Sequence, residues 1–255
     1  MSKLMTALFG GLIAYGGFTV LTNSSSMNKM INMAISLLKN KFELKELDVG
    51  EFKKIVLKKM LPFYTKLYTI KNLGTVSVLT LNIGIMNVIS FNINSFFKDL
   101  PQMALEFVSM LNKRIIICEI YDFMINKEDE KYKNFLKEIK EINEKHSNLK
   151  EATLSVSWHS SYLSGVIKKR GNVMNDNQFL SLLKEVLEAY IKYAEKVSEL
   201  NDDDIKKKIN YYQEFTDNLT KKGGVAINNF RKSIGEKKTH EFLSKAFYGH
   251  SHYQK

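Results

Sequence analysis

The sequence predicts an α+β protein in which helices flank one antiparallel sheet, an α/β/α sandwich. Residues 62–123 consist of short segments rich in β-branched and aromatic residues, which is typical of consecutive strands. From residue 128 onward, apolar residues recur at helical spacing instead. A third observation is that residues 4–22 carry no charge, which adds an N-terminal apolar helix to the prediction.

The N-terminal segment has the length of a membrane span. Nineteen uncharged residues at helical rise cover a hydrocarbon layer of about 30 Å. Lysines follow at positions 29, 39 and 41, which favours a cytoplasmic domain tethered to the inner face of the membrane by residues 4–22. Two alternatives remain open. A secretory signal lacks an Ala-x-Ala-like site here, and a soluble or peripheral segment would suit the glycine pairs at 10–11 and 16–17.

The next elements follow from breaks and periodicity. Residues 23–26 read Asn-Ser-Ser-Ser and predict a break, after which residues 27–38 show one apolar helical face. Residues 51–60 predict a second helix that ends before Pro62. We expect strands at 63–71, 75–83, 88–94, 104–110 and 113–123, and the strict alternation within 88–94 predicts a strand with one buried and one polar face.

The C-terminal half predicts helices. Asn201 and the aspartates after it form a strong helix start, and a pair of glycines at 223–224 ends that helix. Two short helices separated by Gly235 follow. Two longer helices precede them, with apolar faces formed by Tyr132, Phe135, Ile139 and Ile142, and by Phe179, Leu183, Val186, Tyr190, Ala194 and Val197.

Composition fits one large domain or two small ones. The chain has 255 residues, 44% of them hydrophobic, and no repeat or low-complexity linker divides it. We divide it into an apolar segment (1–26), a helical extension (27–60), the sandwich domain (61–249) and a tail (250–255). Cys118 is the single cysteine and lies in an apolar run, so we expect a buried thiol in a reducing compartment.

The net charge of +11 favours an acidic partner. Nucleic acid, anionic lipid and an acidic electron-transfer protein are each compatible with this positive charge. A lysine-rich composition can also occur without any such partner. The chain lacks a nucleic-acid-binding motif, and glutamate and aspartate balance the lysines of its helices. We therefore expect no nucleic-acid partner.

An ordered series of short motifs resembles the ferredoxin-dependent bilin reductases. The first strand with its Gly74 turn, the Asp-Leu-Pro corner at 99–101, the Glu-Phe-Val segment at 106–108 and the apolar strand ending at Asp122 follow the order of that family's core. Trp158, the basic cluster 168–170 and the closing segment 230–249 continue the resemblance, which covers residues 61–249.

This resemblance implies that a linear tetrapyrrole lies between the sheet and the C-terminal helices. It implies reduction by single electrons from ferredoxin, with no cofactor or metal bound in the protein. Two positions depart from the family pattern. Glu106 stands where the family has its proton-donating aspartate, and Tyr68 stands where some members have a catalytic histidine. Whether catalysis survives these differences stays open, because near-attack geometry is sensitive to one methylene.

Glu106 is the first catalytic candidate, because a carboxyl between Leu105 and Phe107 acquires a raised pKa if it is desolvated. The alternative is a surface glutamate on an edge strand. Glu119 is a supporting carboxyl under the same hypothesis. The other catalytic candidates are Tyr68 and His159, and the candidates for substrate binding are Trp158, Asp122, Lys168, Lys169 and Arg170.

The basic cluster 168–170 has a simpler interpretation as a solvated turn. His250 and His252 have a chelating spacing, but they lie at the end of the chain, where we expect fraying and no metal site. Two hypotheses result. The chain is a bilin-reductase-like oxidoreductase, or a descendant that only binds a tetrapyrrole; alternatively, it is a non-enzymatic, membrane-anchored binding or scaffold protein with a basic surface.

Overall fold

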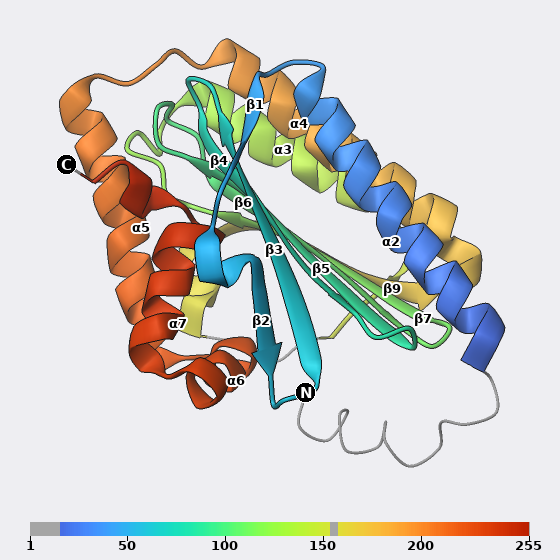
Figure 1. The fold of residues 1–255 in the computed structure, drawn as a ribbon. Coiled ribbons are helices and arrows are strands. Elements are labelled where there is room, and N and C mark those ends of the chain that lie inside the picture. Colours follow the sequence, from blue (N-terminus) through green and yellow to red (C-terminus); the bar gives the residue numbers. More distant parts are fainter. Residues whose placement is uncertain (1–15, 154–157, 255) are drawn as a thin grey trace.

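A single antiparallel sheet forms the centre of the molecule, with helices on both of its faces (Figure 1). The computed structural model describes residues 16–153 and 158–254. Within them the strand order is β1-β3-β4-β5-β6-β7-β9-β8, with β2 pairing beside β1 on β3. Every pairing is antiparallel. The predicted antiparallel sheet flanked by helices is therefore confirmed.

The strands follow the predicted order with short turns between neighbours. Their bounds are β1 Leu44–Leu47, β2 Lys54–Leu57, β3 Leu61–Ile70, β4 Gly74–Asn82, β5 Met86–Ser95, β6 Gln102–Met110, β7 Lys113–Tyr121, β8 Lys150–Glu151 and β9 Leu163–Asn172.

The helices precede and follow this run. Their bounds are α2 Gly16–Lys39, α3 Glu130–Lys145, α4 Asp176–Lys196, α5 Asp202–Lys222, α6 Val225–Ile234 and α7 Glu236–Phe242. Short 3-10 turns lie at Gly50–Lys53, Trp158–Tyr162, Val173–Asn175 and His250–His252, and a π-helical turn spans Leu243–Phe247.

One face of the sheet packs against α2, α3 and α4 through a continuous apolar core. Alternate residues of the central strands enter it, such as Leu105 and Phe107 of β6. Phe107 meets Phe179 of α4 with ring centroids 6.2 Å apart. Arg114 of β7 is fully buried at the rim and pairs with Asp176 at the start of α4 at 2.8 Å. Most of this face is covered, and a groove of about 480 Å³ stays open beside α2, where Tyr64, Tyr68 and Thr80 line it.

The opposite face lies under α5, α6, α7 and the C-terminal residues (Figure 1). An aromatic cluster fills one end, where Phe123 meets Tyr212 at 4.9 Å and Phe215 at 5.2 Å between ring centroids. Polar side chains of β4 and β5 line the rest of the covered region. Asn92, for example, is buried and donates to Ser90 and Ser77. The polar face predicted for residues 88–94 is therefore present, but it is buried, because helices cover both faces of the sheet.

Tertiary contacts overrule three local predictions. Helix α2 runs unbroken through residues 23–26, because neighbouring elements hold its polar side chains: Ser26 donates to Asp176 at 2.5 Å and Asn23 to the Gly84 carbonyl at 3.3 Å. Residues 51–60 form a 3-10 turn and strand β2 instead of a helix, since β3 offers them a partner strand. The basic cluster 168–170 lies within β9 rather than in a turn.

The two termini of the chain also bear on the predictions. Residues 4–15 of the predicted anchor lie outside the described residues. Among the helices that the structure describes, none combines the length and apolar character that a membrane span requires. At the other end the predicted frayed tail is folded: His250 is buried, and its Nε2 lies 3.1 Å from the Gln213 Oε1 of α5.

Candidate active site

Glu106 lies at the middle of the sheet on the face that the C-terminal helices cover. The register pairs it with Ser90 of β5 and Ile117 of β7, whereas its neighbours Leu105 and Phe107 point into the opposite core. Burial, followed by repulsion from Glu119, raises the pKa of Glu106 to about 7. The side chain is nevertheless open to solvent. Protein atoms surround this carboxyl, and solvent still reaches it. We use the word recess for this solvent-open part of the sheet face, which is defined by the exposed or half-buried side chains of Glu106, Val108, Ile115 and Val166.

The recess has an apolar floor beside this carboxyl. Val108 and Ile115, paired across β6 and β7, are half-buried on the same face, and Val166 of β9 is exposed. A cavity of about 20 Å³ borders Glu106 from the α2 side, and Phe91 and Leu183 help to line it. That cavity is far too small for a pigment, since small-molecule sites enclose about 300 Å³ or more. On the C-terminal side, by contrast, the Glu106 and Val166 side chains are exposed to solvent.

Glu119 supplies a second carboxyl on the same face. It follows Ile117 by two residues on β7 and is therefore the diagonal neighbour of Glu106. The Tyr121 hydroxyl donates to Glu119 Oε2 at 2.7 Å, and Lys168 Nζ of β9 lies 3.7 Å from Glu119 Oε1. The basic residue Lys168 thus faces the recess, in contact with one of its acids.

The last residues of the chain help α5, α6 and α7 to cover this face of the sheet. The Tyr248 carbonyl accepts from Thr75 at 2.7 Å and from Asn94 at 3.2 Å, which fastens the C-terminus to β4 and β5. Burial raises the pKa of the Tyr248 hydroxyl, and repulsion from Glu106 and Glu119 adds to it. Gly249 follows with a φ of 76°, and a Cβ there would lie 3.0 Å from Thr75 Cγ2. Glycine therefore permits this close approach.

Trp158 and His159 lie at the side of the recess. Trp158 Nε1 donates to the Gly223 carbonyl at 2.8 Å, which ties the turn before β9 to the end of α5. The His159 ring lies 6.1 Å from that of Tyr121. Burial lowers the pKa of His159; Glu119 opposes this effect and Lys168 adds to it. The structure therefore brings His159, Lys168, Glu119 and Glu106 to one region.

Tyr68 lies on the other face of the sheet. It pairs with Val76, whose side chain enters the core beneath α2, and it lines a groove beside that helix. Burial and the neighbouring Glu46 raise its pKa. Side chains alternate along a strand, so Tyr68 and Glu106 cannot reach the same pocket. The expectation that both act on one substrate is contradicted by this arrangement.

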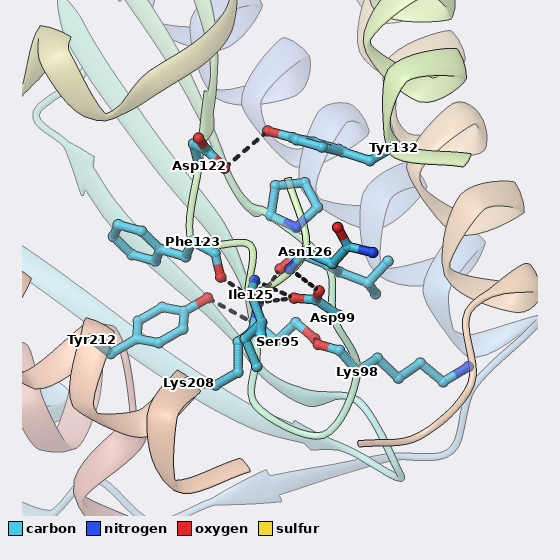
Figure 2. Close-up of polar contacts among 12 residues, drawn as sticks. Ser95, Lys98, Asp99, Asp122, Phe123, Ile125, Asn126, Tyr132, Lys208 and Tyr212 are labelled. Carbon is cyan, nitrogen blue, oxygen red and sulfur yellow. Dashed lines mark hydrogen bonds and ion pairs between the residues drawn. The ribbon is translucent and has the colours of Figure 1, made fainter. Parts of the chain in front are cut away.

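Asp122 and Lys169 also point elsewhere, whereas Arg170 shares the face of Lys168. Asp122 turns toward α3, where the Tyr132 hydroxyl lies 3.5 Å from its Oδ1 (Figure 2), and it pairs with Lys127 at 2.8 Å. Lys169 is buried on the α3 and α4 side, where it pairs with Glu151. Arg170 is paired with Ile115 of β7 and Lys150 of β8; its side chain is exposed and donates to the Glu151 carbonyl at 3.1 Å.

The buried side chain of Lys208 links helix α5 to the sheet. Lys208 of α5 donates to the carbonyls of Leu100 and Phe123 at 2.7 and 2.6 Å, and it lies 3.3 Å from Asp99 Oδ1 (Figure 2). The Asp99 carboxyl also accepts from the backbone N–H groups of Ile125 and Asn126, both at 2.9 Å. Burial outweighs the attraction of Asp99 and lowers the pKa of Lys208 to about 8. The Asp-Leu-Pro corner is thus the attachment point of α5.

Sequence reasoning missed Tyr121, Tyr248 and Lys208 as parts of the site and its support. The local sequence carries no signal for Lys208, which is the third lysine of an apparently solvated run at 206–208. A weak signal existed for the sheet, because Ser90, Asn92 and Asn94 are polar positions on a strand between two apolar ones. Polar side chains on a central strand indicate a covered but polar surface.

The fold and the recess define a class: a three-layer sandwich with an acidic, solvent-accessible site between its sheet and its C-terminal helices. Comparison with known proteins identifies the family. The family model of the ferredoxin-dependent bilin reductases matches residues 33–248, and the chain belongs to that family.

A solved structure shows the same fold. The phytochromobilin synthase from tomato, crystallised in complex with biliverdin, superposes with a TM-score of 0.72 and covers 88% of this chain and 83% of its own. The two sequences are 14% identical, so this likeness concerns the fold. Among curated protein sequences, no match was found.

Proposed function

We propose that this protein binds a linear tetrapyrrole in the recess between the sheet and the C-terminal helices and reduces it with electrons from reduced ferredoxin. Membership of the bilin reductase family and the biliverdin bound by the tomato protein support the ligand class. The observation that carries the proposal is the position of Glu106, an acid whose pKa of about 7 suits proton donation at neutral pH.

The reaction balances as follows. Saturating one double bond takes two electrons and two protons, so two reduced ferredoxins are each oxidised by one electron. Each added electron makes the tetrapyrrole more basic, and Glu106 in its protonated form donates to the carbon or nitrogen above it. Because the Glu106 carboxyl is open to solvent, water can return the proton before the second transfer.

Binding would rest on complementary chemistry around Glu106. The flat, apolar pyrrole rings suit the floor made by Val108, Ile115 and Val166. The propionate groups of a bilin are anionic, and the basic side chain of Lys168 lies on this face, 3.7 Å from the Glu119 carboxyl. The net charge of +11 would speed encounter with an acidic electron donor.

The binding test is a titration of the full chain with biliverdin, followed by absorbance. We expect a red-shifted bound spectrum, and no spectral change at high protein concentration would overturn the proposal. Val166→Trp should weaken binding at least about 10-fold, because a large ring would fill the recess. Val56→Trp is the matched control: Val56 and Val166 are similarly exposed, at 42% and 44%, but Val56 lies on β2, away from the recess.

The turnover test adds reduced ferredoxin under anaerobic conditions. We expect the bound spectrum to convert to that of a product two electrons more reduced, with two ferredoxins oxidised per bilin. Stable binding without conversion would show a bilin-binding protein that is not a reductase.

A further inference from the structure

We propose that Glu119 is a positioning residue that keeps the transferable proton on Glu106. The proposal rests on the proposed function. In it, the carboxyl of Glu119 controls the protonation state of Glu106. Glu119 need not touch the substrate to have this role.

The contacts of the two carboxyls differ. Glu119 accepts a hydrogen bond from Tyr121 at 2.7 Å and faces Lys168 at 3.7 Å, and its side chain is 16% exposed. A hydrogen-bond donor and a nearby ammonium group stabilise the negatively charged form of a carboxyl. Within the part of the chain that the structure describes, the Glu106 carboxyl has neither a hydrogen bond nor an ion pair. One acid is thus provided with partners for its charge and the other is not.

The distance between the two acids makes their charges interact. Diagonal neighbours on adjacent antiparallel strands have side chains about 7–8 Å apart, and Glu106 and Glu119 are such neighbours. Two like charges at that separation in a partly desolvated site repel each other, so the charge of one disfavours ionisation of the other. A single proton shared by the pair therefore resides on Glu106, the acid without stabilising partners.

The other titratable groups around the pair come from three further places in the fold. They are Lys168 of β9, His159 of the turn before it and Tyr248 at the C-terminal end, with Tyr121 of β7 itself. Burial raises the pKa values of both tyrosines above their usual range, so they stay neutral near pH 7. The pKa of His159 is lowered, so it loses its proton at a more acidic pH than a free histidine. Glu106 is the group whose titration is centred at about 7.

The experiment measures the titration of Glu106 without bilin, by NMR of ¹³C-labelled glutamate carboxyls in the full chain. The Glu106 signal is assigned by its loss in Glu106→Gln. In Glu119→Gln we expect the Glu106 midpoint to fall by about 1 unit, because the repelling charge is gone. Glu119→Met should do the same if the amide disturbs folding, and Glu119→Asp should preserve most of the raised midpoint.

The matched control is Glu151→Gln. This residue also pairs with a lysine of β9, but with Lys169 on the opposite face. Its loss should leave the Glu106 midpoint unchanged. An unchanged midpoint in Glu119→Gln and Glu119→Met, or an equal fall in Glu151→Gln, would overturn the proposal.

A kinetic measurement complements the titration. At saturating bilin, single-turnover rates should fall as the pH rises through the midpoint of Glu106, and Glu119→Gln should move that fall about 1 unit lower. A loss of stability alone would not move the pH profile. Because the NMR titration needs no substrate, a failure of bilin reduction and a failure of the Glu119 assignment are distinguishable.

Discussion

The two faces of the sheet use the same strands for different purposes. Beneath α2, α3 and α4, the residues that the central strands contribute to the core are mostly apolar and buried. Beneath α5, α6 and α7, the same strands present serine, asparagine and glutamate, and the middle strands stay open to solvent around Glu106. Of two adjacent residues on one strand, one therefore packs in the core and stabilises the fold, and the other faces the candidate site.

This division has a physical reason. A carboxyl next to a well-packed core would lose hydration without gaining a partner, which is costly. Placing the acids on the less densely covered face keeps them in reach of water, while the opposite face supplies the apolar burial that holds the strands in register. Leu105 and Glu106 are adjacent on β6 but point to opposite faces, so substitutions at these two positions test the difference between the faces.

The largest expected effect is on turnover in Glu106→Gln. The amide keeps the shape of the side chain but cannot donate a proton as an acid, so bilin reduction should fall by about 10²–10⁴-fold while binding persists. Stopped-flow spectroscopy with reduced ferredoxin measures this loss. Reduction at the parental rate would show that another group donates the proton.

The same variant changes how stability depends on pH. The folded state raises the pKa of Glu106 to about 7, so the folded state binds this proton more tightly than the unfolded chain does. The corresponding stability is present at low pH and is lost as the pH rises from about 4.5 to about 7. Urea unfolding at several pH values should show this decline in the parent and a weaker one in Glu106→Gln.

Leu105→Ala tests the apolar face one residue away. Leu105 is buried in the core beneath α2, so truncation should lower the free energy of unfolding by about 2–5 kcal/mol. Val166→Ala, on the open face, should change it by less than about 0.5 kcal/mol. Chemical denaturation checks both, and equal losses would remove the distinction between the two faces.

Lys208→Met tests the attachment of α5 to the Asp-Leu-Pro corner. The carbonyls of Leu100 and Phe123 would lose their donor, so we expect a loss of about 2–4 kcal/mol by denaturation. Lys207→Met is the control, because that lysine is exposed and its ion pair is with its helical neighbour Asp204.

The charge of Lys208 also predicts a pH effect. Its pKa in the folded state, about 8, lies below that of an unfolded lysine near 10.5, so the folded state binds this proton more weakly. Stability should therefore rise as the pH increases from about 8 to about 10.5. The rise should vanish in Lys208→Met and persist in Lys207→Met.

The smallest effect is expected for Tyr68→Phe. This hydroxyl lies on the α2 side of the sheet, so turnover should stay within about 2-fold of the parent. Tyr121→Phe is the contrasting variant: it removes the hydrogen bond to Glu119 and should lower turnover by about 10-fold, the cost of one hydrogen bond to a charged group. A strong loss in Tyr68→Phe would place the reaction on the other face.

Much of this fold was readable from periodicity. Alternation within residues 62–123 located five central strands, and helical spacing located α3, α4 and α5. Other strands were not predicted from periodicity. Strands β1, β2 and β9 are short or polar and owe their conformation to a neighbouring strand, and residues 23–26 stay helical because β-turn and α4 residues bind their side chains.

The sequence by itself determined the fold class, the resemblance to the bilin reductases and the candidate carboxyl Glu106, because these depend on residue order and local spacing. Only the tertiary structure decided which residues meet. Alternation along a strand says that two faces exist, but the register between strands and the helices above them decide which face is open. For that reason Glu119 joins Glu106, whereas Tyr68 and Asp122 do not.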